Sequence, residues 1–184
     1  GRLYDKYEIM EAVLKFNLSY KVLTNNELFR TAAEKIKQEK IFGWFQGGSE
    51  FGPRALGNRS IFANPISSST KYILDQLMKC RDKYRPYAPV VIEEQASHFF
   101  DINDSSPVMM RNVKVSDKRL VAVQHVDGTA RVQTVNKKQN KILYSLLLEV
   151  EKTIGIPVLL NTSFNRPGEP IVESPNDALS SFSE

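Results

Sequence analysis

The chain has 184 residues, with 25 Lys and Arg against 21 Asp and Glu, and a net charge of +4. This length fits one domain around a single core, and no apolar run approaches the roughly 20 residues of a membrane-spanning helix. One Cys and two His cannot form the usual Cys/His zinc site, and a lone Cys forms no intrachain disulfide, which favours a cytoplasmic protein.

The first third of the chain is predicted to contain helices and short strands. Residues 4–20 are weakly amphipathic, and the chain has no initiator Met, so we expect residues 1–20 to be a linker or connecting helix from a preceding domain. Asn26 can cap a helix whose apolar side chains, up to Ile36, fall on one face. A buried strand is expected over Ile41–Phe45, and a short extended piece over Ser60–Ala63.

The middle of the chain alternates between helix and strand signals. Ser68 or Ser69 can cap a helix that ends near residues 79–81. Ala88–Ile92 is a strand candidate, and Glu93–Phe100 is a short helix candidate. Residues 105–118 are polar and are predicted to be a loop with an extended centre.

The last third holds the clearest periodic patterns. Residues 120–126 and 129–135 are predicted to be two strands of a hairpin joined through Asp127-Gly128. Residues 140–154 have the pattern of an amphipathic helix, with Gly155 as a left-handed C-cap. A buried strand over 157–160 and a helix starting at Ser174-Pro175 follow. Interspersed strands and helices predict an α/β or α+β fold with a mixed sheet.

Two groups of cations are candidates for an anion site. Arg54 and Arg59 lie in a Gly/Pro-rich loop, residues 51–60, and a guanidinium is a planar fork of donors suited to phosphate or carboxylate. Gly-Pro-Arg also occurs in plain surface turns, so a structural role is the alternative. Lys79 and Arg81 flank Cys80 at a predicted helix end, where they bind an anion or cap the helix.

Two further motifs place polar side chains at predicted strand ends. His125, Asp127 and Arg131 share one short motif, in which His125 is either a general acid or base or a buried hydrogen-bonding residue. Asp127 more simply shapes the turn, and Arg131 either binds an anion or faces water. Ser163 and Asn165 follow a buried strand, where they line a ligand crevice or cap a turn.

Taken together, these blocks resemble the C-terminal domain of the O-carbamoyltransferases, which modify nodulation factors and aminoglycoside or cephalosporin antibiotics. The resemblance runs from about Ile41 to the end of the chain, through residues 51–60, 79–81, 125–131 and 161–172 in the family's order. That domain is similar to the YrdC-like fold. The resemblance therefore implies a twisted mixed sheet with flanking helices in a domain spanning residues 21–184.

The resemblance also implies a set of site residues. The YrdC-like ligand signature of a Lys-x-Arg pair and a Ser-x-Asn pair is met here, and the family places the arginine of the His-x-Asp-Gly-Thr-x-Arg motif at the carbamoyl phosphate site. The implied catalytic residues are Lys79, Arg131 and Ser163. The implied substrate-binding residues are Arg54, Arg59, Arg81, Arg85, His125, Asp127, Thr162 and Asn165, and no metal ligand is expected in this domain.

The chemistry implied by the resemblance uses carbamoyl phosphate and ATP, with Mg²⁺ bound to the nucleotide. Carbamoyl phosphate loses phosphate, the carbamate attacks the α-phosphorus of ATP, and pyrophosphate leaves to give carbamoyl-adenylate. A preceding actin/hexokinase-like domain, which holds its own metal ion, then transfers the carbamoyl group to an acceptor hydroxyl. The sequence has no P-loop motif, so the nucleotide is not expected to be held as in P-loop proteins.

The sequence departs from the family pattern at two positions. Gly48 and Ile66 stand where the family has arginines, and losing two charge-assisted contacts can shift affinity or anion choice, or weaken the enzyme. Two alternatives therefore stay open: a scaffold domain that has lost activity, and a YrdC-like module that binds a nucleotide or double-stranded RNA. The interleaving of aromatic with basic residues that favours nucleic acid is scarce.

Overall fold

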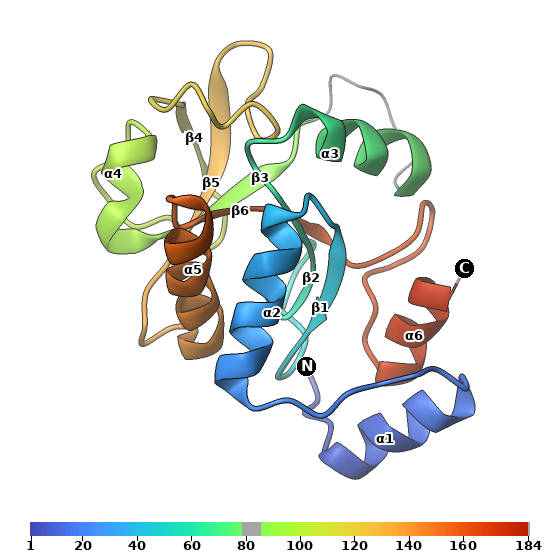
Figure 1. The fold of residues 1–184 in the computed structure, drawn as a ribbon. Coiled ribbons are helices and arrows are strands. Elements are labelled where there is room, and N and C mark those ends of the chain that lie inside the picture. The colour runs from blue at the N-terminus through green and yellow to red at the C-terminus, as the bar shows by residue number, and fades with distance from the viewer. Residues whose placement is uncertain (79–85, 184) are drawn as a thin grey trace.

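The computed structural model describes residues 1–78 and 86–183. In that part of the chain six strands form one sheet, in the order β1-β2-β6-β3-β5-β4 (Figure 1). Neighbouring strands are antiparallel except for β3 and β5, which are parallel, so the prediction of a mixed sheet is confirmed. The strands are β1 (Phe42–Phe45), β2 (Arg59–Ala63), β3 (Ala88–Ile92), β4 (Arg111–Lys114), β5 (Thr129–Val135) and β6 (Val158–Ser163).

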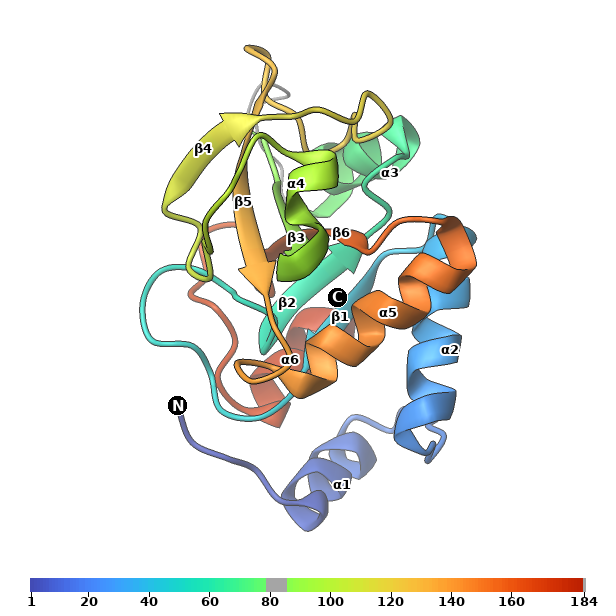
Figure 2. The same ribbon diagram turned by 90° about the vertical axis from the view of Figure 1, so that its left-hand side faces the viewer.

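Both faces of the central strands are buried. Successive side chains of a strand point to opposite faces, and in β3 Val91 packs in one hydrophobic cluster while Val90 and Ile92 pack in the other. Helices α2 (Asn25–Lys37) and α5 (Lys141–Ile154) lie side by side across one face (Figures 1 and 2).

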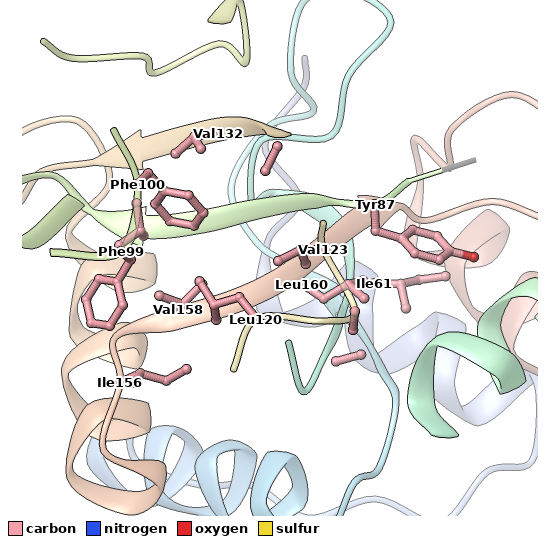
Figure 3. Close-up of a cluster of buried hydrophobic side chains, with 14 of the residues drawn as sticks. Ile61, Tyr87, Phe99, Phe100, Leu120, Val123, Val132, Ile156, Val158 and Leu160 are labelled. Atoms are coloured by element: carbon pink, nitrogen blue, oxygen red, sulfur yellow. The ribbon is translucent and has the colours of Figure 1, made fainter. Parts of the chain in front are cut away.

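The cluster on the opposite face is filled by short elements and turns (Figure 3). It includes Phe99 of the short helix α4 (Ala96–Phe99), which follows the 3₁₀ turn η2 (Glu93–Gln95) as expected for a short helix in this stretch. Helix α6 (Pro175–Ser183) contributes Ala178, and α1 (Lys6–Lys15) lies beside α6. The central strands are therefore a rigid support for polar groups at their ends.

Local hydrogen bonds set where the helices begin and end. The N-cap of α2 is Thr24, whose capping box with Glu27 displaces the predicted cap Asn26 by two residues. Helix α3 (Ser68–Ile73) is capped by Ser67 instead of Ser68 or Ser69, and continues as the π-helical turn η1 (Leu74–Met78).

The predictions for helix α5 and for strands β1 and β6 mostly hold. The N-cap Asn140 accepts a hydrogen bond from the amide of Leu143, and Gly155 ends α5 in the left-handed conformation at φ +79°, as predicted. Strand β6 is longer than expected, because it includes Asn161–Ser163. Strand β1 forms over Phe42–Phe45 as predicted, but it is an edge strand in which Trp44 alone is fully buried, so the predicted burial was wrong.

The predicted hairpin is half wrong. Residues 120–126 form turns, and β5 pairs instead with β4, the extended centre of the predicted polar loop. The apolar residues of this stretch are buried as a turn, in which the amide of Ala122 donates to the carbonyl of Pro65 at 3.0 Å. Asp127-Gly128 still makes a tight turn, with Gly128 at φ +82°.

Candidate functional site

A polar cleft opens where β3, β4 and β5 meet the Gly/Pro-rich loop. Its larger part encloses about 290 Å³, and a smaller part of about 100 Å³ shares Arg54, Arg131 and three other lining residues with it. We call the two parts the arginine cleft. The larger part is lined by Arg54, Pro86, Tyr87, Ala88, Asn112, His125 and Arg131. The smaller part adds Pro53, Ala55, Met109, Asn161, Thr162 and Ser163.

The cleft gathers predicted site residues from distant parts of the chain. Arg54 comes from the loop, His125 and Arg131 from the turn and start of β5, and Thr162 and Ser163 from the end of β6. Sheet order explains this, because β6, β3 and β5 are consecutive neighbours. The predicted residues Lys79, Arg81 and Arg85 lie outside the described residues.

Two predicted substrate-binding residues lie beside the cleft instead of lining it. The exposed Asp127 accepts hydrogen bonds from the amide and the hydroxyl of Thr129, at 2.9 and 2.7 Å. Asn165 accepts a 2.6 Å hydrogen bond from the Ser163 hydroxyl and donates to the carbonyl of Glu169. Ser163 also borders a neighbouring cavity of about 520 Å³, to which Asn165 belongs, so it stands between the two spaces.

Arg59, predicted to bind substrate, is fully buried and does not line the cleft. Its Nη1 donates to the carbonyl oxygens of Gln46, Gly47 and Asn58 at 2.8 to 3.1 Å, and its Nε donates to that of Glu173. Its guanidinium also stacks 3.6 Å above the Phe45 ring. These contacts give the side chain a structural role, which ties the end of the loop to β1.

The loop that carries Arg54 is held by three side chains, those of Glu50, Gln133 and Asn161, that are not among the predicted site residues. Glu50 Oε1 accepts from the amides of Leu56 and Asn58 at 2.5 and 2.7 Å. Gln133 donates to the carbonyl of Leu56 at 2.8 Å, and Asn161 donates to that of Ala55 at 3.0 Å.

The only signal in the sequence for these three side chains is that polar residues interrupt apolar strands at Gln133 and Asn161.

Gly57 allows the loop to pack closely against α5. It has φ +109°, and a Cβ there would lie 2.3 Å from Leu143 Cδ2.

The electrostatics of the cleft favour an anion. Burial lowers the pKa of Arg131, and the positive charge of Arg54 lowers this pKa further. The buried Nε of Arg131 has no hydrogen-bond partner in the described part of the chain. Burial also lowers the pKa of His125; the Asp127 carboxylate opposes this shift and the Arg131 charge adds to it. Two guanidiniums without a carboxylate partner among the described residues leave a positive site open to a dianion.

The described residues include no group of three or more His, Cys, Asp or Glu that could hold a metal ion. They also include no helix that is long and apolar enough to cross a bilayer.

The six-stranded mixed sheet with flanking helices is a fold of the YrdC-like kind, and comparisons with known proteins identify the family of the chain. Residues 33–184 match the family described as carbamoyltransferase C-terminus, and the chain belongs to that family. The resemblance seen in the sequence is thereby confirmed.

The curated relatives agree with this family. The chain is 43% identical over 164 residues to nodulation protein NolO of Bradyrhizobium diazoefficiens. The aligned region covers 86% of this chain and 30% of that protein. It is 41% identical over 142 residues to 3'-hydroxymethylcephem-O-carbamoyltransferase of Amycolatopsis lactamdurans. Here the aligned region covers 76% of this chain and 27% of that protein. The chain thus spans less than a third of the length of these relatives.

A solved structure supports the fold. Full-length HypF, in its phosphate- and nucleotide-bound form, has a TM-score of 0.63 over 90% of this chain and 20% of that chain. Sequence identity is 17%, so this likeness concerns the fold alone.

Proposed function

We propose that this chain is the domain of an O-carbamoyltransferase that binds carbamoyl phosphate and ATP with Mg²⁺ and forms carbamoyl-adenylate. The observation that carries the proposal is that Arg54 and Arg131, from segments 77 positions apart, line one cleft with Ser163 at its far end. Phosphoryl chemistry depends largely on positioning and charge neutralisation, and paired guanidiniums on a rigid support supply both.

The reaction has a defined balance. Water and carbamoyl phosphate give carbamate and inorganic phosphate; a carbamate oxygen then attacks the α-phosphorus of ATP, and pyrophosphate leaves with the electron pair of the broken P–O bond. In this scheme Arg54 and Arg131 donate hydrogen bonds to phosphate oxygens, and the Thr162 hydroxyl and the Ser163 hydroxyl oxygen contact the substrate. Lys79, Arg81 and Asn165, which belong with Ser163 to the family signature, complete the site together with Arg85. Transfer to an acceptor hydroxyl belongs to a preceding actin/hexokinase-like domain of a longer, cytoplasmic polypeptide.

The two departures from the family pattern lie away from the lining of the arginine cleft. Ile66 packs against the hydrophobic core, and a Cβ at Gly48 would lie 2.4 Å from the carbonyl oxygen of Gly1. Both positions therefore serve packing in this chain. The retained arginine pair favours an active domain over a scaffold that has lost activity.

Exchange of labelled pyrophosphate into ATP tests the proposal. We expect exchange that depends on carbamoyl phosphate, with no carbamoylation of an acceptor hydroxyl by this chain alone, because nothing described here holds an acceptor in near-attack geometry. Arg131→Lys should abolish exchange, whereas Arg30→Lys on the exposed side of α2 should keep it. A folded chain that binds ATP without exchange would favour the scaffold. Salt-sensitive binding of duplex RNA in place of ATP would favour the nucleic-acid module.

A further inference from the structure

Three side chains in the turn before β5 form a hydrogen-bonded row. The Nδ1 atom of His125 lies 3.2 Å from the hydroxyl oxygen of Thr129, and this hydroxyl lies 2.7 Å from Oδ1 of Asp127. The turn itself is closed by the amide of His125, which donates to the carbonyl of Thr129 at 2.7 Å. The row is therefore built into the backbone geometry of the turn.

The protons in this row have only one consistent arrangement at neutral pH. Hydrogen bonds from Thr129 lower the pKa of Asp127, so its carboxylate is ionised and can only accept. The single hydroxyl proton of Thr129 goes to that carboxylate. The hydroxyl oxygen then accepts from His125, which must carry its proton on Nδ1.

The second ring nitrogen is consequently an acceptor. Burial lowers the pKa of His125, so the ring is neutral and its Nε2 atom carries a free electron pair. Nε2 makes no hydrogen bond with the described part of the chain. The ring lines the arginine cleft, where the charged side chains Arg54 and Arg131 can only donate. The cleft thus contains, in addition to two guanidinium donors, a neutral ring nitrogen that can accept a hydrogen bond.

We propose that His125 is a specificity-determining residue, whose Nε2 accepts a hydrogen bond from the amide N–H of carbamoyl phosphate while the arginines bind its phosphate. This inference rests on the proposed function. Thr129 and Asp127 are positioning residues that hold the ring in the accepting tautomer. An acyl phosphate that carries a methyl group in place of the amino group cannot donate to Nε2, so the site selects carbamoyl phosphate against acetyl phosphate.

A pair of stable analogues isolates this contact. Phosphonoacetamide carries the amide, and acetonylphosphonate has a methyl group in its place; neither loses its phosphonate in water. By calorimetry the wild-type chain should bind the amide about tenfold more tightly, which corresponds to roughly 1.4 kcal/mol. His125→Phe and Thr129→Val should bring the affinity ratio close to one, with acetonylphosphonate binding unchanged. Thr129→Ser, which keeps the hydroxyl, should retain the preference.

The outcomes separate this inference from the function on which it rests. If neither analogue binds the wild-type chain, the proposed function fails. Equal wild-type affinities for both analogues would overturn the role of His125 while leaving the arginine site intact. A preference that persists in Thr129→Val would overturn the positioning role of the row.

The tautomer can be observed directly. The chain has two His, so long-range ¹H–¹⁵N correlation spectra, with His98→Gln for assignment, report the nitrogen shifts of each ring. We expect an Nδ1–H tautomer for His125 in the wild-type chain and in Thr129→Ser. An Nε2–H tautomer in the wild-type chain would contradict the proposal.

Discussion

Asn161 Nδ2 donates a 3.0 Å hydrogen bond to the carbonyl oxygen of Ala55, a residue 106 positions earlier in the chain. The same amide donates to Gln133 Oε1 at 2.9 Å, so β6 and β5 hold the loop together. Ala55 directly follows Arg54. The position of the arginine in the cleft therefore depends on a polar side chain in the middle of the sheet.

Replacing this side chain should affect stability and binding together. Asn161→Ala leaves the Ala55 carbonyl without its buried partner, and we expect a loss of about 2–3 kcal/mol in the free energy of unfolding. Phosphate affinity should fall as well, because the loop is no longer held. Urea denaturation and phosphate titration measure both. Asn103→Ala, at an exposed position that makes no hydrogen bond with the described residues, should change neither.

Arg131→Lys should weaken anion binding without weakening the fold. A lysine ammonium cannot make the paired contacts of a guanidinium, so we expect the dissociation constant for inorganic phosphate to rise about tenfold or more. Calorimetry gives the constant, and thermal melts give the stability. Arg30→Lys is the matched control, and an unchanged dissociation constant in both variants would show that only charge matters, because Arg→Lys keeps the positive charge.

Arg59→Lys should have the opposite pattern. Four carbonyl oxygens accept from the buried guanidinium, and an ammonium has too few donors and the wrong shape to replace it. We expect the free energy of unfolding to fall by about 2–4 kcal/mol, so that the variant unfolds at a clearly lower urea concentration. At low temperature, where the variant is still folded, phosphate affinity should stay within about twofold of wild type. A selective loss of affinity would restore the predicted role in substrate binding.

Two glycines of the loop separate backbone strain from steric fit. Gly52 and Gly57 have nearly equal φ values, +110° and +109°, but a Cβ at Gly52 meets nothing within 4 Å whereas one at Gly57 meets Leu143. Gly52→Ala should therefore cost only the strain, about 1–3 kcal/mol. Gly57→Ala should cost about 1–3 kcal/mol more, through overpacking against α5. Equal unfolding free energies in urea would show that the loop yields at Gly57.

The preference for an amide ligand should depend on pH through His125. Burial lowers its pKa, with Arg131 lowering and Asp127 raising it, and Arg54 also faces the cleft. Protonation removes the acceptor, so the affinity ratio of the two analogues should hold from pH 8 to about 6.5 and fall only at lower pH. Ionisation of the phosphonate cancels in the ratio.

The same lowered pKa bears on stability. Because the unfolded chain takes up the proton first, folding free energy is lost as pH drops below about 6.5, and His125→Phe should lessen that loss. Urea denaturation at pH 7 and at pH 5 measures the difference. If the wild-type ratio of affinities for phosphonoacetamide and acetonylphosphonate changes only above pH 7, the lowered pKa of His125 is contradicted.

The sequence predicts local features well and distant contacts poorly. Helix α5 is predicted from its period and from Gly155. Arg54 is selected because a guanidinium in a Gly/Pro turn suits an anion, and Arg131 because it matches the His-x-Asp-Gly-Thr-x-Arg motif of the family. Gln133 and Asn161 were missed because their partners are carbonyl groups 77 and 106 positions away.

Two predictions rest on sequence patterns that have more than one structural origin. The apolar stretch 120–126 was predicted to be a strand because burial, which a turn can also satisfy, produces the same pattern. The assignment of Arg59 to the substrate stays a prediction, because sequence does not distinguish a guanidinium that binds phosphate from one that binds carbonyl groups, as this one does.

The place of β6 in the sheet has a consequence for synthesis. It is the last strand in the chain, yet it lies between β2 and β3. Each of these two strands therefore keeps one unpaired edge until β6 has been synthesised. A ribosome releases the amino-terminal strands first, and until residue 163 has emerged the nascent chain has two unpaired strand edges and no cleft. Ligands therefore cannot assist the early stages of folding, and chains truncated before β6 should need a chaperone or be degraded.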